Sequence, residues 1–158
     1  MNKQTLIQAI LSQLNNELTH ALEAAEEAHK GATHDQSKAE TQYDTLGLEH
    51  AYLAEGQAKR IASLKEQITM LNNMALKEFT DDDPIYMSAI VHLINQQTHQ
   101  PLIVFIAPCA GGTHIQHEGQ QIQVISANSP LTQALLGLYV DDICKLESGV
   151  QFEITRVI

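Results

Sequence analysis

The sequence is poor in aromatic residues and in cysteine. Phe, Tyr and Trp make up 4% of the 158 residues and Trp is absent, so a broad core of large rings is not expected. The two cysteines, Cys109 and Cys144, lie far apart and form no CxxC pair. This pattern is typical of reduced thiols packed as small hydrophobic side chains.

Long apolar runs are also missing, and none approaches the length of a membrane span. The chain starts at Met1 with an amphipathic pattern and has no small-residue cleavage site typical of a secretory signal. We therefore expect a cytoplasmic protein without a membrane segment.

Basic residues are scarce in both halves. Residues 1–79 carry eleven acids and seven Lys or Arg, residues 80–158 carry eight acids and two, and the net charge is −10. A protein that binds duplex DNA directly needs a surplus of positive charge, so no sequence-specific DNA contact of its own is expected. An acidic body suits a partner with basic surfaces.

The first helical pattern covers residues 4–32. Apolar residues recur there at alternating steps of four and three, which is typical of a coiled-coil seam. This seam consists of Ile7, Leu11, Leu14, Leu18, Ala21, Ala25, Ala28 and Ala32. Gly31 can end the helix, and we expect the turn, or tip, at about residues 31–38.

A second helical pattern runs from about residue 38 to residue 78. Its seam consists of Ala39, Tyr43, Leu46, His50, Ala54, Gln57, Ile61, Leu64, Ile68, Leu71 and Ala75. In an antiparallel hairpin its bulky early residues would face the alanines of the first helix, as packing requires. Residues 1–79 therefore predict a two-helix antiparallel coiled coil. Gly47 and Gly56 inside the second helix indicate close helix approach, a tolerated defect or a bend.

The pattern changes after an acidic stretch at residues 80–86, where Pro84 disfavours a helix before it. Residues 87–158 predict a second domain, an antiparallel sheet with one short helix, which makes the fold class α+β. Expected strands lie at Ala89–Ile94, Leu102–Ala107, Ile122–Ile125, Ile143–Leu146 and Val150–Val157. The helix should start at Ser129 as N-cap with Pro130 in its first turn.

This order of elements, with its motifs, resembles the bacterial Gre (GreA/GreB-like) family of transcript-cleavage and transcription elongation factors. The resemblance is clearest at Ile125–Gly137 (ISANSPLTQALLG) and continues through Asp141–Ile143 and Phe152–Ile158. At the hairpin tip, Glu40–Asp44 resembles the acidic tip segment of the family. The resemblance implies that the C-terminal domain is FKBP-like.

The resemblance also implies a function. Gre factors bind RNA polymerase and insert the coiled coil into its secondary channel, where two tip carboxylates help to hold a Mg²⁺ ion in the polymerase active site. The family implies no cofactor and no catalytic residue of the chain's own, so it is not expected to be an enzyme. We expect a monomer whose exposed turn at Asn128, Ser129, Pro130 and Leu131 docks on the polymerase. The expected tip residues are His34, Asp35, Ser37, Glu40, Tyr43 and Asp44.

The tip departs from the family pattern in the spacing of its acids. The family has an Asp and a Glu three residues apart, whereas Asp35 and Glu40 are five apart, and residues five apart do not share a helix face. Two alternatives therefore stay open beside cleavage stimulation through Asp35 and Glu40. One is a cleavage-inactive channel binder that inhibits or competes with cleavage factors, and the other is a general coiled-coil interaction protein.

His114 and His117 are a weaker candidate, for a metal site. They lie three residues apart in a predicted Gly-rich hairpin loop. Such a pair could chelate a metal ion. No second pair of Cys or His accompanies it, so solvated loop histidines are the simpler interpretation.

Overall fold

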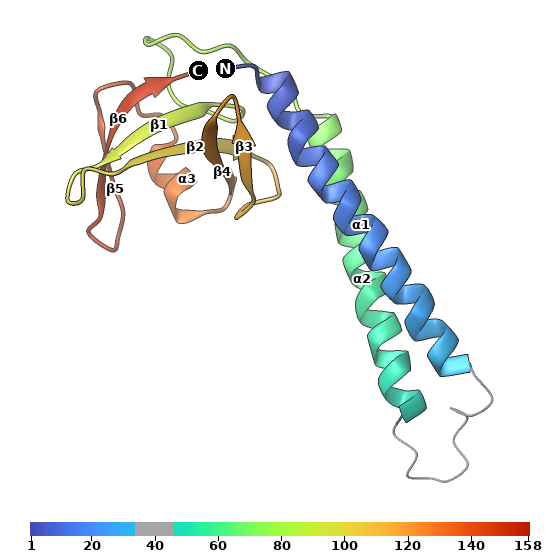
Figure 1. Cartoon of the computed structure of the whole chain (residues 1–158). Coiled ribbons are helices and arrows are strands. Elements are labelled where there is room, and N and C mark those ends of the chain that lie inside the picture. The colour runs from blue at the N-terminus through green and yellow to red at the C-terminus, as the bar shows by residue number, and fades with distance from the viewer. Residues whose placement is uncertain (34–45) are drawn as a thin grey trace. The chain divides into compact units, whose positions relative to one another are not determined.

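The computed structural model describes residues 1–33 and 46–158. The helices are α1 (Lys3–Thr33), α2 (Leu46–Asn72) and α3 (Pro130–Leu135). The strands are β1 (Ile90–Asn95), β2 (Pro101–Ala107), β3 (His114–His117), β4 (Gln120–Ser126), β5 (Ile143–Lys145) and β6 (Gln151–Val157) (Figure 1). A helix pair followed by a sheet domain with one short helix confirms the predicted fold class.

The chain divides into two compact units. One unit contains Met1–Ile10 together with Met70–Ile158, and the other contains Leu11–Thr69. The start of α1 therefore belongs to the unit that holds the sheet. The sequence placed the boundary later, at residues 80–86.

The helical unit buries the predicted seam. Within Leu11–Thr69 the α1 seam residues and those of α2 from Ala54 onward are buried or half-buried, while most of their neighbours are exposed. These seam residues are Leu11, Leu14, Leu18, Ala21, Ala25, Ala28, Ala54, Gln57, Ile61, Leu64 and Ile68. The guanidinium of Arg60 on α2 lies 3.2 Å from the carboxylate of Glu17 on α1, so the two helices lie side by side at this level.

The ends of the helices differ from the prediction. The first helix continues past Gly31 to Thr33, and the second ends at Asn72 rather than near residue 78. Gly56 lies inside α2, and a Cβ added there would meet nothing within 4 Å. Close helix approach is therefore not the reason for this glycine.

The sheet has six strands in the order β3-β4-β2-β1-β6-β5. All neighbouring pairs are antiparallel except β2 and β4, which are parallel. The prediction of a purely antiparallel sheet was therefore wrong, and the sheet is mixed. After β2 the chain crosses to the sheet edge and forms β3. It then turns back as β4, which lies between β3 and β2 and runs in the same direction as β2.

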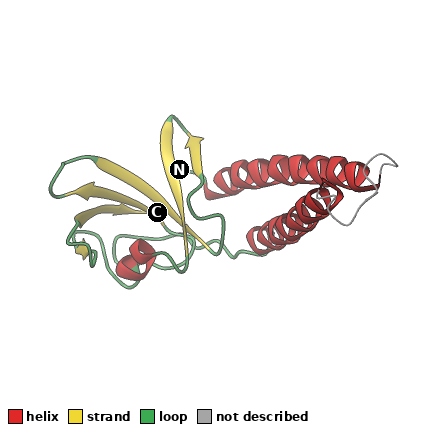
Figure 2. Cartoon of the chain, turned by 90° about the horizontal axis from the view of Figure 1, so that it is seen from below, coloured by secondary structure: helices red, strands yellow, loops and turns green. Residues whose placement is uncertain are grey.

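The core of this unit lies between one face of the sheet and α3, which Figure 2 shows as the short helix beside the strands. Val91, Val104 and Leu135 are among its fully buried members. On the alternate positions of the same strands Ile90, Phe105 and other apolar residues are also fully buried. Both faces of the central strands are thus apolar.

The acidic stretch at residues 80–86 is an ordered turn. The Asp83 carboxylate lies 2.6 Å from the Lys77 ammonium and accepts hydrogen bonds from the main chain and hydroxyl of Thr80, at 2.9 and 2.8 Å. On either side, Phe79 and Ile85 are buried in the sheet core. This stretch therefore packs as part of the sheet unit.

In the described ranges, no helix combines the length and the apolar character needed to cross a membrane.

Candidate functional site

The turn at residues 128–131 is the predicted site that the structure describes in full. Ser129 caps α3, because its Oγ accepts a hydrogen bond from the main-chain N–H of Thr132 at 3.1 Å. Pro130 occupies the first turn, where its missing N–H costs no hydrogen bond. The predicted N-cap and the start of the helix are confirmed.

Further hydrogen bonds fix the shape of this turn. The buried Thr132 hydroxyl donates to the carbonyl of Ser126 at 2.7 Å, and the Gln133 side-chain amide donates to the carbonyl of Ala127 at 2.7 Å. Behind the turn, a Cβ added to Gly111 would lie 2.9 Å from Ser126 Oγ. The turn is therefore held in one conformation by hydrogen bonds from α3 and by the close packing of Gly111 against Ser126.

The outer side of the turn faces solvent. Asn128 and Pro130 are exposed, and Leu131 is half-buried while packing against the core. The turn thus presents an amide, a rigid ring and part of an apolar side chain. This chemistry suits a protein-protein contact. The turn itself supplies no titratable side chain for acid-base catalysis.

The predicted tip and metal residues lie outside the described residues. They are His34, Asp35, Ser37, Glu40, Tyr43 and Asp44, and their roles stay predictions. Within residues 1–33 and 46–158, no group of three or more His, Cys, Asp and Glu could hold a metal ion.

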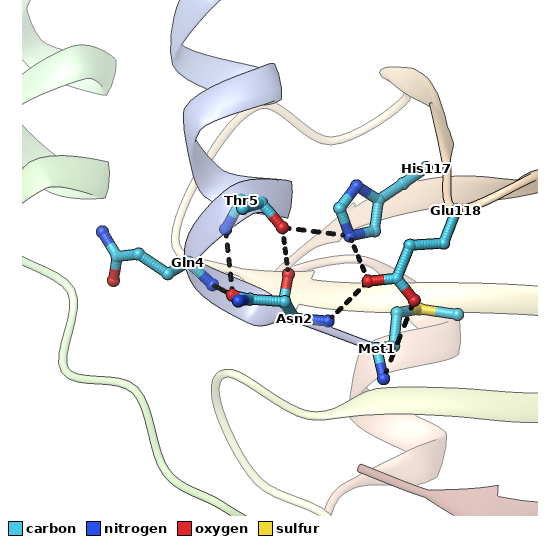
Figure 3. Close-up of polar contacts among 6 residues, drawn as sticks. All are labelled: Met1, Asn2, Gln4, Thr5, His117 and Glu118. Carbon is cyan, nitrogen blue, oxygen red and sulfur yellow. Dashed lines mark hydrogen bonds and ion pairs between the residues drawn. The ribbon is translucent and has the colours of Figure 1, made fainter.

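His114 and His117 do not lie in a loop, as the sequence suggested, but form the two ends of β3. Residues three apart on a strand point to opposite faces, so the pair does not chelate. Figure 3 shows His117 in a polar contact instead: its Nε2 lies 3.3 Å from the Thr5 hydroxyl and 3.4 Å from the Glu118 carboxylate. His117 therefore helps to attach the start of α1 to the hairpin of β3 and β4.

Glu118 has a second contact in the same place. Its carboxylate accepts a hydrogen bond from the main-chain N–H of Asn2 at 3.0 Å (Figure 3), and this bond holds the pKa of Glu118 below its usual range. The Asn2 side chain in turn caps α1, because its Oδ1 accepts from the N–H groups of Gln4 and Thr5. The first turn of α1 is therefore fixed within the sheet unit.

The surroundings of Cys144 disfavour a reactive thiolate. Cys144 is fully buried, and its burial raises the pKa of the thiol, which disfavours the thiolate. Cys109 is half-buried. The prediction that Cys144 packs as a small hydrophobic residue is confirmed.

Two residues have surroundings that the sequence did not predict. Lys3 is buried, with 3% of its surface exposed, and burial lowers the pKa of its ammonium to about 8. His92 is half-buried, and its Nε2 has no hydrogen-bond partner among the described residues. The sequence contained a signal for His92, because this histidine is the one polar residue in the otherwise apolar run Ala89–Ile94.

No protein-family model matches the chain, and no curated protein sequence matches it. Among solved structures, GreA factor homolog 1 (Gfh1) of Thermus thermophilus is 21% identical over 94% of each chain, with a TM-score of 0.39. Gfh1 of Thermus aquaticus is 23% identical over 95% of this chain and 94% of that chain, with a TM-score of 0.39. The prokaryotic transcription elongation factor GreA/GreB of Nitrosomonas europaea is 17% identical over 69% and 91%, with a TM-score of 0.34. By name, these neighbours fall in the Gre family that the sequence resembles.

Proposed function

We propose that this chain is a Gre-like regulator of transcription elongation. In this proposal it binds RNA polymerase through the turn at residues 128–131 and inserts the helix pair into the secondary channel. It acts as a factor of the polymerase and has no catalytic residue of its own.

The observation that carries the proposal is the Asn128–Leu131 turn. Its sequence is the most specific part of the resemblance. The Ser129 cap fixes the conformation of the turn, and Asn128 and Pro130 are exposed on it. A preorganised turn loses little conformational freedom on binding, which favours affinity.

The helices supply the second support. The 31 residues of α1 correspond to about 46 Å at 1.5 Å per residue. Between Ala21 and Ala28 the buried or half-buried seam residues of α1 are all alanine, so this part of the helix pair is thin. A long, thin helix pair suits a channel that excludes a globular domain.

The action in the channel has two alternatives. If Asp35 and Glu40 reach one Mg²⁺ in the polymerase active site, the factor stimulates cleavage of backtracked RNA, because carboxylate oxygens suit that ion. If their five-residue spacing keeps them apart, the factor occupies the channel without stimulating cleavage and competes with cleavage factors.

Binding is tested with purified bacterial core RNA polymerase immobilised on a sensor. The double substitution Asn128→Ala/Pro130→Ala leaves the Ser129 cap in place and should weaken binding at least about tenfold, as for central interface residues. Glu147→Ala/Ser148→Ala changes two exposed residues in the β5–β6 turn and should leave the affinity unchanged. If the wild-type chain does not bind polymerase, the proposal fails and a general coiled-coil interaction protein becomes the better interpretation.

Cleavage is tested with stalled, backtracked elongation complexes and end-labelled RNA. Shortened RNA that disappears with Asp35→Ala/Glu40→Ala supports cleavage stimulation through these acids. Shortening that persists in the double variant rules out this pair. No shortening by a polymerase-binding wild type supports the cleavage-inactive alternative.

A further inference from the structure

One face of the helical unit, Leu11–Thr69, carries an open hollow between α1 and α2. Its volume is about 250 Å³, and its lining residues are Glu17, His20, Ala21, Ala24, Gln57 and Arg60. The two alanines leave the hollow unfilled, because their side chains end at Cβ. A cavity of about 150 Å³ already holds a benzene-sized molecule, so this hollow has room for one large side chain.

Exposed apolar side chains lie beside this hollow on α2. Leu53 is 56% exposed and Tyr52 is 64% exposed. Leu53 lies one helical turn before Gln57, and residues four apart share a helix face. Gly56 lies one turn before Arg60, and a Cβ added to it would meet nothing within 4 Å. A protruding leucine and an unfilled hollow therefore lie on one face, with a glycine between them.

The charges along α2 change sign at Gly56. Residues 46–56 contain no Lys or Arg and two acids, Glu49 and Glu55. Residues 57–69 contain one acid and three bases, Glu66, Lys59, Arg60 and Lys65. A second α2 that lies antiparallel across Gly56 thus brings the acidic half of each helix to the basic half of the other. Such complementary charges fix the register of a contact.

Two of these charges already pair within α2, and two stay accessible to another chain. Lys59 contacts Glu55 at 2.9 Å, so this pair adds little. Arg60 contacts Glu17 at 3.2 Å but is 59% exposed, and a guanidinium has five N–H donors. Glu49 is exposed in the first turn of α2.

A second copy of the chain fits this face, because a two-fold axis exchanges the protruding leucine and the hollow. Leu53 comes three residues before Gly56, so in an antiparallel pair centred on Gly56 it lies opposite position 59 of the other copy. There it meets the hollow beside Gln57 and Arg60, in the manner of a knob that enters a hole between helices. The same patch serves on both sides, which closes the assembly at two copies.

We propose that two copies of this chain associate through this face as an antiparallel pair of α2 helices, with Leu53 of each copy in the hollow of the other. Tyr52 adds an exposed aromatic ring at the border of the contact. The dimer replaces the monomer expected from the sequence. This inference is independent of polymerase binding and of the turn at residues 128–131.

Sedimentation velocity of the full-length chain over a range of concentrations tests the proposal, and it should show a reversible equilibrium of monomer and dimer. Leu53→Glu brings a charge into a hollow that already contains Glu17 and should weaken dimerisation at least about tenfold, as for a central interface residue. Because Leu53 is exposed in one copy, the variant should stay folded, which circular dichroism checks.

Leu22→Glu is the matched control. Leu22 is 46% exposed, and at two positions from Ala24 it lies on nearly the opposite side of α1 from the hollow. This substitution also replaces an exposed leucine of the helical unit by a charge, and it should leave the dimerisation constant unchanged.

A cysteine cross-link tests the antiparallel arrangement. In Gly56→Cys the new thiols of two copies lie near the two-fold axis and should form an intermolecular disulfide with oxidised glutathione. Leu22→Cys and the wild type, which contains Cys109 and Cys144, should remain without this cross-link. A dimer that gives no cross-link through position 56 would overturn the antiparallel arrangement.

A wild-type chain that stays monomeric at every concentration would overturn the proposal. A dimer that persists unchanged in Leu53→Glu, or that is weakened equally in Leu22→Glu, would place the contact on another face and overturn this interface. If the wild type is monomeric and Leu53→Glu weakens binding to polymerase, the face belongs to the polymerase contact and not to a second copy.

Discussion

The ammonium group of Lys3 lies 4.6 Å from the centroid of the Phe79 ring. The Lys3 ammonium also donates a hydrogen bond to the carbonyl of Lys77, and the Lys77 ammonium lies 4.8 Å from the same ring. Cation-π attraction and this hydrogen bond favour the position of Lys3. Burial opposes its charge and lowers its pKa to about 8, with Glu78 offsetting a part.

We expect the free energy of unfolding to depend on the pH through Lys3. Between pH 8 and 10.5 the unfolded chain binds a proton on Lys3 that the folded chain has released, so stability rises with pH. The stability difference between wild type and Lys3→Met should shift in favour of wild type by on the order of 2 kcal/mol from pH 7.5 to 10. Denaturant unfolding at both pH values measures this shift, and a constant difference would contradict the prediction.

Asp83 should give the same direction of dependence at low pH. Hydrogen bonding from Lys77 and then from Thr80 lowers the pKa of Asp83 from 3.8 to about 2. The stabilisation is therefore present above pH 4 and lost as the pH falls toward 2. Thermal unfolding of Asp83→Asn should show a lower melting temperature at pH 7 and a smaller loss between pH 4 and 2. Asp82→Asn, at an exposed neighbour, serves as the control and should behave like wild type.

Removing the cap of α3 should destabilise the sheet unit. Ser129→Ala deletes the acceptor for the Thr132 N–H, and loss of an N-cap typically costs about 1 kcal/mol. Ser148→Ala, in an exposed turn, should change the free energy of unfolding by less than about 0.5 kcal/mol. Urea unfolding of both variants distinguishes them, and equal stabilities would mean that the cap contributes nothing.

Gly56→Ala should stabilise the chain. The residue lies inside α2 with open space at its Cβ position, and Ala is favoured over Gly in a helix by about 0.8–1 kcal/mol. Gly137→Ala is a matched contrast, because Gly137 has a φ of 83° and Ala is strained there, at a cost of about 1–2 kcal/mol. Melting temperatures that move in the same direction for both variants would contradict this account.

Local patterns in the sequence predicted much of the fold. The heptad in α1 predicted which residues are buried, because side chains at steps of three and four share a helix face. Ser129-Pro130 predicted a helix start from the chemistry of two residues. The final hairpin was also predicted, and its turn is closed by a hydrogen bond from Gly149 to the Leu146 carbonyl.

Features that depend on distant parts of the chain were not predictable in this way. Strand β3 was missed because Ile115 is the only apolar residue between His114 and His117, which gives no alternation to detect. The parallel pairing of β2 with β4 depends on the path between them. Burial of Lys3 depends on Phe79, which is remote in the sequence, and nothing local to Lys3 signals it.

The candidate site was predictable only where its signal was local. The Asn128–Leu131 turn could be named from its sequence and is described in full. The surroundings of His92 could not, since β1, β2 and β6 bring them together in a register that the sequence does not reveal.

The allocation of Met1–Ile10 to the sheet unit has a practical consequence for dissecting this protein. A fragment that begins at Met70 would lack Leu6 and Ile10, both fully buried, as well as the Asn2 contact to Glu118. This fragment would expose apolar surface and tend to aggregate. A circular permutant that appends Met1–Ile10 to the C-terminus by a flexible linker is the rational design for isolating this half.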